Sequence, residues 1–127
     1  MTLILDPSIL VSVETQYIKD QSKPENDFYV FSYTITIENT GTRTAQLMTR
    51  HWVITDANSK VQEVRGDGVV GEQPVLKPGE HFKYTSGTML ETPVGTMHGS
   101  YGMEDENGES FKAQIAEFIL SQPRVLH

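Results

Sequence analysis

The glycine-rich run from Gly66 to Gly71 has residue types and a spacing that can hold phosphate groups. It matches the pattern G-x-G-x-x-G. In dinucleotide-binding domains this pattern links a strand to a helix whose N-terminus holds a pyrophosphate. In this chain Pro74, Pro78 and Gly79 follow the run and prevent a regular helix from forming. The sequence therefore excludes a Rossmann-type dinucleotide site.

A weaker form of phosphate binding remains open for the same run. Glycines can orient successive backbone N–H groups into a concave anion site without a helix, and Arg65 adds a positive charge beside them. Asp67 and Glu72 place negative charge at the same point, which opposes an anion. One alternative is a structural loop that needs glycine for positive φ or close packing. The other is a pyrophosphate or nucleotide-polyphosphate site formed by Arg65, Gly66, Gly68 and Gly71.

The other chemically competent residues predict neither a metal site nor a catalytic site. The histidines, which are His51, His81, His98 and His127, do not stand at metal-ligand intervals. Hydrogen bonds are therefore the expected partners of His51 and His98. Ser100 lies in a near match to the nucleophile elbow G-x-S-x-G, but His98 replaces the first glycine and no strand-turn-helix context surrounds it. The chain has 0 cysteines, which excludes thiolate chemistry, and we expect no cofactor.

Arg50 stands two residues before Trp52, the one tryptophan of the chain. On a strand the two side chains share a face, and a tryptophan there is expected in the core. An unpaired buried charge is costly, so the guanidinium must reach solvent or a carboxylate. The sequence leaves two roles open for Arg50: partner in a structural ion pair, or contact for a ligand on the sheet face.

A period of two in hydrophobicity identifies the elements that position these residues. In Phe28–Asn39 the odd positions from Tyr29 to Ile37 are apolar and most of the even ones are polar, which is typical of a strand with one buried face. Leu47–Asp56 is predicted as a second strand, with Met48, Trp52 and Ile54 on one face and Leu47 and Val53 on the other. Further strands are expected at Val11–Lys19, Val61–Arg65, His81–Ser86, Thr96–Met103 and Ser110–Leu120.

Turn-forming residues separate these strands. Asn107-Gly108 is expected to supply two positive-φ residues for a hairpin, and the acidic Glu104–Glu106 is expected at its solvated tip. Gly66–Gly79 is the longest stretch without alternation and the expected place of a functional loop. About seven short strands without a long amphipathic helix predict an all-β sandwich of immunoglobulin or fibronectin-III type, with a closed small barrel as the alternative.

Composition restricts the partners of the chain. The length of 127 residues predicts a single domain over 1–127. Its 10 Lys and Arg against 17 Asp and Glu give a net charge of −7, which argues against nucleic acid and anionic membranes as partners. The start Met1–Pro7 lacks the basic region of an export signal, so a cytoplasmic location is expected.

Several runs of the chain together resemble the bacterial ApaG proteins. They extend over nearly the whole sequence and include Tyr29–Asn39, Arg50–Asp56, Gly66–Pro74, Tyr84–Gly87 and Gly99–Tyr101. Ala116 departs from the proline that members often carry ahead of the last strand. The resemblance implies a fibronectin-III-like sandwich in a bacterial cytosolic protein and an association with cobalt resistance and magnesium efflux. It also implies a suggested pyrophosphate site at Gly66, Gly68 and Gly71, and it brings no established catalytic residues.

Two functions of different classes follow as expectations. The first is a non-enzymatic interaction module that binds an unidentified protein partner and affects divalent cations indirectly. The second is a sensor that binds pyrophosphate or a nucleotide polyphosphate at Gly66–Gly71. Exposed edge strands leave a homodimer possible without demanding it.

Overall fold

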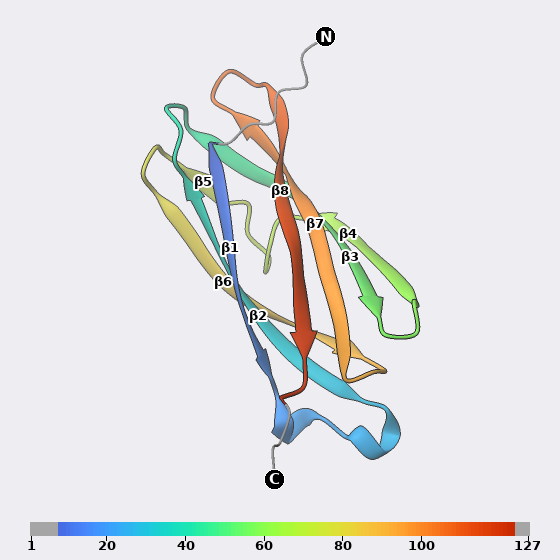
Figure 1. Cartoon of the computed structure of the whole chain (residues 1–127). Helices are drawn as coiled ribbons and strands as arrows, with labels where there is room; N and C mark the ends of the chain where they lie inside the picture. The colour runs from blue at the N-terminus through green and yellow to red at the C-terminus, as the bar shows by residue number, and fades with distance from the viewer. Residues whose placement is uncertain (1–7, 124–127) are drawn as a thin grey trace.

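The computed structural model describes residues 8–123, which form two antiparallel sheets packed face to face (Figure 1). Met1–Pro7, which carry the argument about export, and His127 lie outside the described residues. The elements, in chain order, are β1 Ile9–Tyr17, the short 3-10 helices η1 Lys19–Gln21 and η2 Pro24–Asn26, β2 Tyr29–Asn39, β3 Ala45–Asp56, β4 Val61–Asp67, β5 Val75–Leu76, β6 His81–Leu90, β7 Val94–Asp105 and β8 Ser110–Ser121.

One sheet has the strand order β1-β2-β6 and the other β4-β3-β7-β8. The two-residue strand β5 pairs with Ala45 and Gln46 of β3, while β4 pairs with residues 49–55 of β3. Strand β7 occupies one edge of β3 along the whole length of β3. Strands β5 and β4 therefore follow one another along the opposite edge of β3. The predicted antiparallel sandwich is confirmed. The two sheets remain separate among the described strands, so the closed barrel is excluded.

Alternation along β2 builds one half of the core. Its odd positions from Tyr29 to Asn39 are all buried, and Ile35 and Ile37 are fully inaccessible. The even positions are half-buried and face outward from the three-stranded sheet. Burying one face of each sheet against the other removes apolar surface from water, which is the main favourable term in folding. No helix in residues 8–123 is long and apolar enough to cross a membrane.

Trp52 of β3 joins the two sheets, as expected of a core tryptophan. Its side chain is 3% exposed. The indole ring lies 5.4 Å from the ring of Tyr33 on the opposite sheet, 5.9 Å from that of Phe118 and 6.3 Å from that of Tyr101. The three contacts are edge-on, the arrangement that aromatic quadrupoles favour.

A bulge in β3 makes one predicted face assignment wrong. The register with β7 shifts between Leu47 and Thr49, so Met48 is an extra residue and the alternation changes side there. Leu47 is fully buried with Trp52 and Ile54, whereas Met48 is half-buried on the other side. Simple alternation carried back from Trp52 cannot detect this extra residue.

Two predictions about loops also need correction. Of Asn107 and Gly108, only Gly108 has a positive φ, at 78°. The Gly108 amide donates to the carbonyl of Asp105, and the Asp105 amide donates to the carbonyl of Glu109, so the loop is wider than a two-residue hairpin. The stretch Gly66–Gly79 is less irregular than expected, because Gly66 and Asp67 complete β4 and Val75–Leu76 forms β5.

Candidate functional site

The predicted glycine-rich run is an arch that connects β4 to β5 along the edge of β3. At its tip the amide of Glu72 donates to the carbonyl of Val69 and the amide of Val69 donates to that of Glu72. Between them Val70 and Gly71 have φ of 44° and 81°, which is the type I′ geometry of a tight hairpin. The side chain of Val69 is 1% exposed and anchors the arch in the core. The fold therefore uses these glycines for chain reversal and close packing.

Most polar groups of the arch bind within the protein. The amide of Gly68 donates to the carbonyl of Met48 over 2.9 Å, and Gln73 Nε2 donates to the same carbonyl over 2.9 Å. At the tip, the amides of Val70 and Gly71 donate to no group among residues 8–123. These two amides at the tip are available to an anion.

Arg50 holds the start of the arch. Its Nη1 donates to the carbonyl of Asp67 over 2.9 Å and to the carbonyl of Gly68 over 3.0 Å. The guanidinium lies against Gly66, where a Cβ would come within 2.7 Å of its central carbon. Arg50 thus has a positioning role in place of the predicted ion pair. It also lines the hollow beside β4, and its role as a ligand contact stays a prediction. Its guanidinium binds backbone carbonyls, and no carboxylate lies within 4.0 Å of it among the described residues.

Two buried tyrosines lie on the core side of Arg50. The hydroxyls of Tyr84 and Tyr101 are 2.5 Å apart. Burial raises the pKa of Tyr84 to about 12, while its hydrogen bond with Tyr101 and the positive charge of Arg50 act in the opposite direction. Burial also raises the pKa of Tyr101 well above its usual range. Both hydroxyls therefore keep their protons near neutral pH and act as structural hydrogen-bonding groups.

The outer face of the five-stranded sheet carries a hollow of about 390 Å³ next to β4. The register places its side chains in two rows across the strands, because directly opposed residues on antiparallel strands point to the same side. One row runs Asp67, Thr49, Gly102 and Lys112, and the next runs Arg65, His51, Ser100 and Gln114. All of these residues except Gln114 line the hollow.

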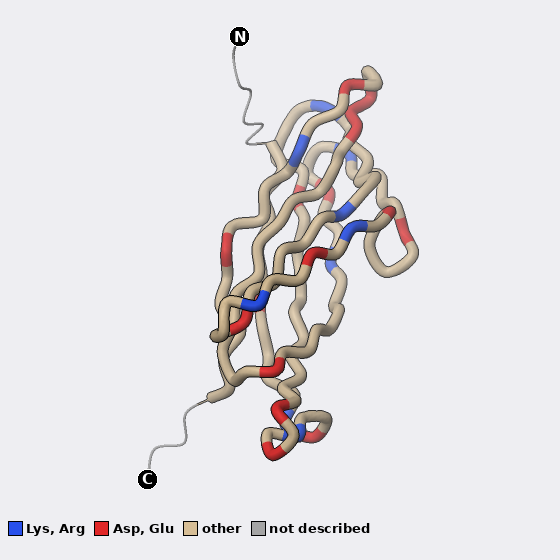
Figure 2. Tube along the Cα trace, turned by 90° about the vertical axis from the view of Figure 1, so that its right-hand side faces the viewer, with Lys and Arg blue, Asp and Glu red and all other residues tan. Residues whose placement is uncertain are grey.

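Charge in the hollow is mainly positive, in contrast to the acidic chain as a whole. Arg65 and Lys112 are exposed, and neither has a carboxylate within 4.0 Å among the described residues, whereas Arg43 and Lys60 do. His51 Nε2 lies 3.1 Å from Glu63 Oε1, which confirms the hydrogen bond expected of this histidine, whereas the exposed ring of His98 has no hydrogen-bond partner among residues 8–123. Figure 2 shows basic residues interspersed with the more numerous acidic ones over the side of the molecule that carries β3 and β4.

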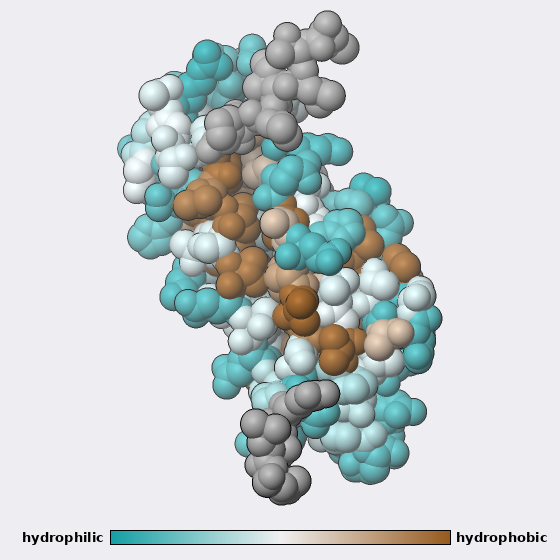
Figure 3. Space-filling model, viewed as in Figure 1, coloured by the Kyte–Doolittle hydropathy of each residue, from teal (hydrophilic) through white to brown (hydrophobic). Residues whose placement is uncertain are grey.

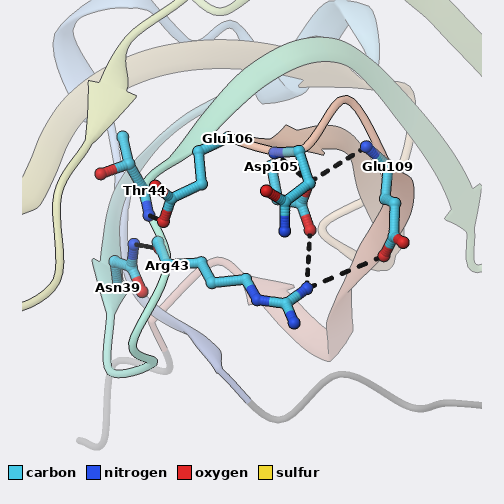
Figure 4. Close-up of polar contacts among 7 residues, drawn as sticks. Asn39, Arg43, Thr44, Asp105, Glu106 and Glu109 are labelled. Atoms are coloured by element: carbon cyan, nitrogen blue, oxygen red, sulfur yellow. Dashed lines mark hydrogen bonds and ion pairs between the residues drawn. The ribbon is translucent and has the colours of Figure 1, made fainter.

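The acidic β7–β8 turn is a structural feature that ties two loops together (Figure 4). Arg43 Nη1 lies 3.3 Å from Asp105 Oδ2 and 3.8 Å from Glu109 Oε2, and Glu106 Oε1 accepts the amide of Thr44 over 3.0 Å. Backbone hydrogen bonds from Glu109 and Asn107, with the nearby Arg43, lower the pKa of Asp105. Within residues 8–123 no cluster of three or more acidic or histidine side chains could hold a metal ion.

A family model described as the ApaG domain matches residues 19–105. The chain belongs to the ApaG family. Protein ApaG of Thiobacillus denitrificans is 63% identical over 119 residues, which cover 94% of both chains. Protein ApaG of a Shewanella species is 58% identical over 123 residues, covering 97% of this chain and 98% of the relative. A crystal structure of a Bordetella pertussis protein described as ApaA has 55% identity and a TM-score of 0.90, covering 92% of this chain and 95% of that one.

The resemblance to ApaG is thus confirmed, and the hollow lies on an ApaG sandwich. The structure brings Arg65 and Gly66 into the lining of the hollow. Gly68 and Gly71 do not line it, because they lie in the arch beyond the end of β4. Sequence reasoning did not propose Thr49, Gly102 or Lys112. Alternation could have shown that Lys112 points outward between Phe111 and Ala113, but the neighbouring strands could not be read from the sequence.

Proposed function

We propose that this ApaG-family chain is a non-enzymatic protein-interaction module of the cytoplasm, and that it binds its partner through the face formed by β1 and β8. These are the outermost strands of the two sheets, and they lie side by side (Figure 1). Leu10, near the start of β1, is 56% exposed and Ile119, near the end of β8, is 63% exposed, each on the outer side of its own sheet. Figure 3 shows hydrophobic surface along both strands. This exposed apolar surface on two adjacent edge strands is the observation that carries the proposal.

Half-buried side chains extend the apolar surface between the two strands. Val11 and Val13 on β1 and Phe111 and Phe118 on β8 pack against the core, and each keeps part of its surface accessible. A partner that covers them removes apolar area from water at about 25 cal/mol per Å². Each of the two strands also has one edge that no described strand pairs with, so its backbone groups are available to an added strand.

A protein partner also accounts for the association that the family resemblance implies. Cobalt resistance and magnesium efflux concern ions that cross a membrane, and no helix in residues 8–123 could span one. We propose that the module acts on cation handling indirectly, by binding a protein that takes part in it.

The test is an affinity pull-down from native cytosol at native abundance. The variant Leu10→Lys/Ile119→Lys places charge on the β1–β8 face. The matched control Val61→Lys/Val75→Lys changes two valines of similar exposure, 59% and 54%, on β4 and β5. The proposal expects specific proteins that the wild type and the control recover and the β1–β8 variant loses. Recovery of no specific protein, or equal recovery by all three chains, contradicts it.

A second function, a pyrophosphate or nucleotide-polyphosphate sensor, is supported by a different observation. A hollow lined by Arg65 and Gly66 lies beside the glycine-rich arch, and the Val70 and Gly71 amides at the tip of the arch have no partner in the described chain. Calorimetric titration with pyrophosphate and with adenine dinucleotides, with and without Mg²⁺, tests it. Dissociation constants no tighter than millimolar contradict the sensor.

A further inference from the structure

We propose that the hollow on the outer sheet face binds the phosphate groups of a small molecule between Arg65 and Lys112. The proposal rests on the second of the two functions above and changes where the phosphate is held. The binding groups are side chains of four neighbouring strands, and the amides of the glycine-rich arch do not take part.

The two cations stand on opposite rims of the hollow. Arg65 lies on β4 and Lys112 on β8, which are the first and last strands in the order β4-β3-β7-β8. Adjacent strands are about 4.8 Å apart, so the two backbones are separated by about 14 Å. Each long side chain can reach toward the middle, where a diphosphate presents an anionic group to either side. This separation favours a ligand with two linked phosphates over one with a single phosphate.

The floor between the cations is low and polar. Ser100 is 9% exposed and lies in the row of Arg65, and Gly102 lies in the row of Lys112. A Cβ at Gly102 would come within 2.2 Å of Thr49 Oγ1, so the Thr49 hydroxyl occupies the space that a side chain would fill. The Ser100 and Thr49 hydroxyls are hydrogen-bonding groups of the type that binds phosphate oxygens, and they add geometry to the charge of the rims.

Arg65 and Lys112 are available for an external anion. With 17 acidic residues in the chain, cations on its surface have many possible carboxylate partners. Among the Lys and Arg side chains of residues 8–123 only Arg43 and Lys60 are paired in this way, at 3.3 Å and 3.1 Å, so what distinguishes Arg65 and Lys112 is that both line one hollow. Arg65 and Lys112 have no carboxylate within 4.0 Å among residues 8–123. Of the residues that line the hollow only Asp67 is acidic, and its exposed side chain limits how much negative charge the ligand can carry.

The experiment is a titration of the full chain with inorganic pyrophosphate, followed by calorimetry and by amide chemical shifts. Arg65→Gln and Lys112→Gln should each weaken binding about tenfold, because each removes one charge-assisted hydrogen bond to a phosphate oxygen. Asp67→Asn should tighten binding severalfold. Lys83→Gln, which changes an exposed strand lysine on the other sheet, is the matched control and should leave the affinity unchanged. The same calorimetric stability in all four variants shows that each is folded.

The amide shifts distinguish the hollow from the arch. Binding in the hollow should move the amide signals of Thr49, Ser100 and Gly102, whereas binding at the arch should move those of Val70 and Gly71. Pyrophosphate binding that survives Arg65→Gln/Lys112→Gln, with shifts confined to the arch, overturns the hollow and leaves the sensor function standing. An absence of binding at millimolar pyrophosphate overturns both.

Discussion

The glycine-rich arch contains two glycines with the same backbone requirement and different surroundings. Gly68 has a φ of +64° and Gly71 a φ of +81°. A Cβ at Gly68 would lie 2.3 Å from the carbonyl oxygen of Glu72, while a Cβ at Gly71 would meet nothing within 4 Å. Gly68→Ala and Gly71→Ala therefore form a matched pair that separates backbone strain from close packing.

The magnitudes follow from these two surroundings. A non-glycine residue in the left-handed region costs about 1–2 kcal/mol, and the lower entropy of the unfolded chain returns about 0.4–1 kcal/mol. Gly71→Ala should thus lower the free energy of unfolding by about 1 kcal/mol. Gly68→Ala should lose a further 1–3 kcal/mol or so, because the backbone at Glu72 must move and its paired hydrogen bonds with Val69 are disturbed.

Urea denaturation at neutral pH, followed by tryptophan fluorescence of Trp52, measures both variants. The expected order of stability is wild type, Gly71→Ala and then Gly68→Ala, with a clear gap between the two variants. Equal stability of the two variants would refute the view that the first of these glycines is required by close packing against Glu72. A urea midpoint of Gly68→Ala equal to that of the wild type would also refute the view that the positive φ at this position requires glycine.

Four further predictions concern other parts of the sandwich. Val70 is β-branched, 56% exposed and has a φ of 44°, so its backbone is strained. Val70→Asn, which suits a type I′ turn, should raise the free energy of unfolding by about 1 kcal/mol; an unchanged urea midpoint would count against backbone strain at Val70. Tyr84→Phe should lower the free energy of unfolding by about 1–3 kcal/mol, because it leaves the Tyr101 hydroxyl buried without its partner. In a double-mutant cycle, Tyr84→Phe/Tyr101→Phe should lose less stability than the sum of the two single variants; additive losses would exclude the coupling. Burial raises the pKa of Tyr84 from its ordinary 10.0 to about 12, so the folded state holds this proton more tightly than the unfolded chain. Stability should therefore be complete below pH 10 and fall as the pH rises from about 10 to 12; denaturation at these two pH values measures the fall, and Tyr84→Phe should reduce it. The lowered pKa of Asp105 gives stability above pH 3.8 that is lost as pH falls below it, and acid titration of Asp105→Asn should show a smaller loss than the wild type.

Much of the fold was predictable because strand alternation depends on local chemistry. Every second residue from Tyr29 to Asn39 is buried, as the hydrophobic pattern indicated. All seven predicted strands are present, with ends that differ by a few residues. Strand β5 was not predicted, since two residues carry no period. The bulge at Met48 was not predicted either, because an extra residue is defined only by its partner strand.

The candidate site was only half predictable from the sequence. Arg65 and Gly66 belong to a recognisable run, but the hollow also needs Lys112 and Thr49, which lie far from that run in the sequence. Their proximity depends on the strand order β4-β3-β7-β8, a long-range property that no local pattern specifies. The role of Arg50 likewise depends on the backbone carbonyls of Asp67 and Gly68, and a search of the sequence for a carboxylate partner cannot find it.

The central claim is that the chain works by binding a protein on its β1–β8 face. Hydrogen–deuterium exchange of the chain with and without the partner recovered in the pull-down tests it most directly. The account predicts slower amide exchange in Ile9–Tyr17 and Ser110–Ser121 when the partner is bound, and no such protection in Leu10→Lys/Ile119→Lys. Protection confined to β4 and β5, or exchange that the partner leaves unchanged along β1 and β8, would contradict it.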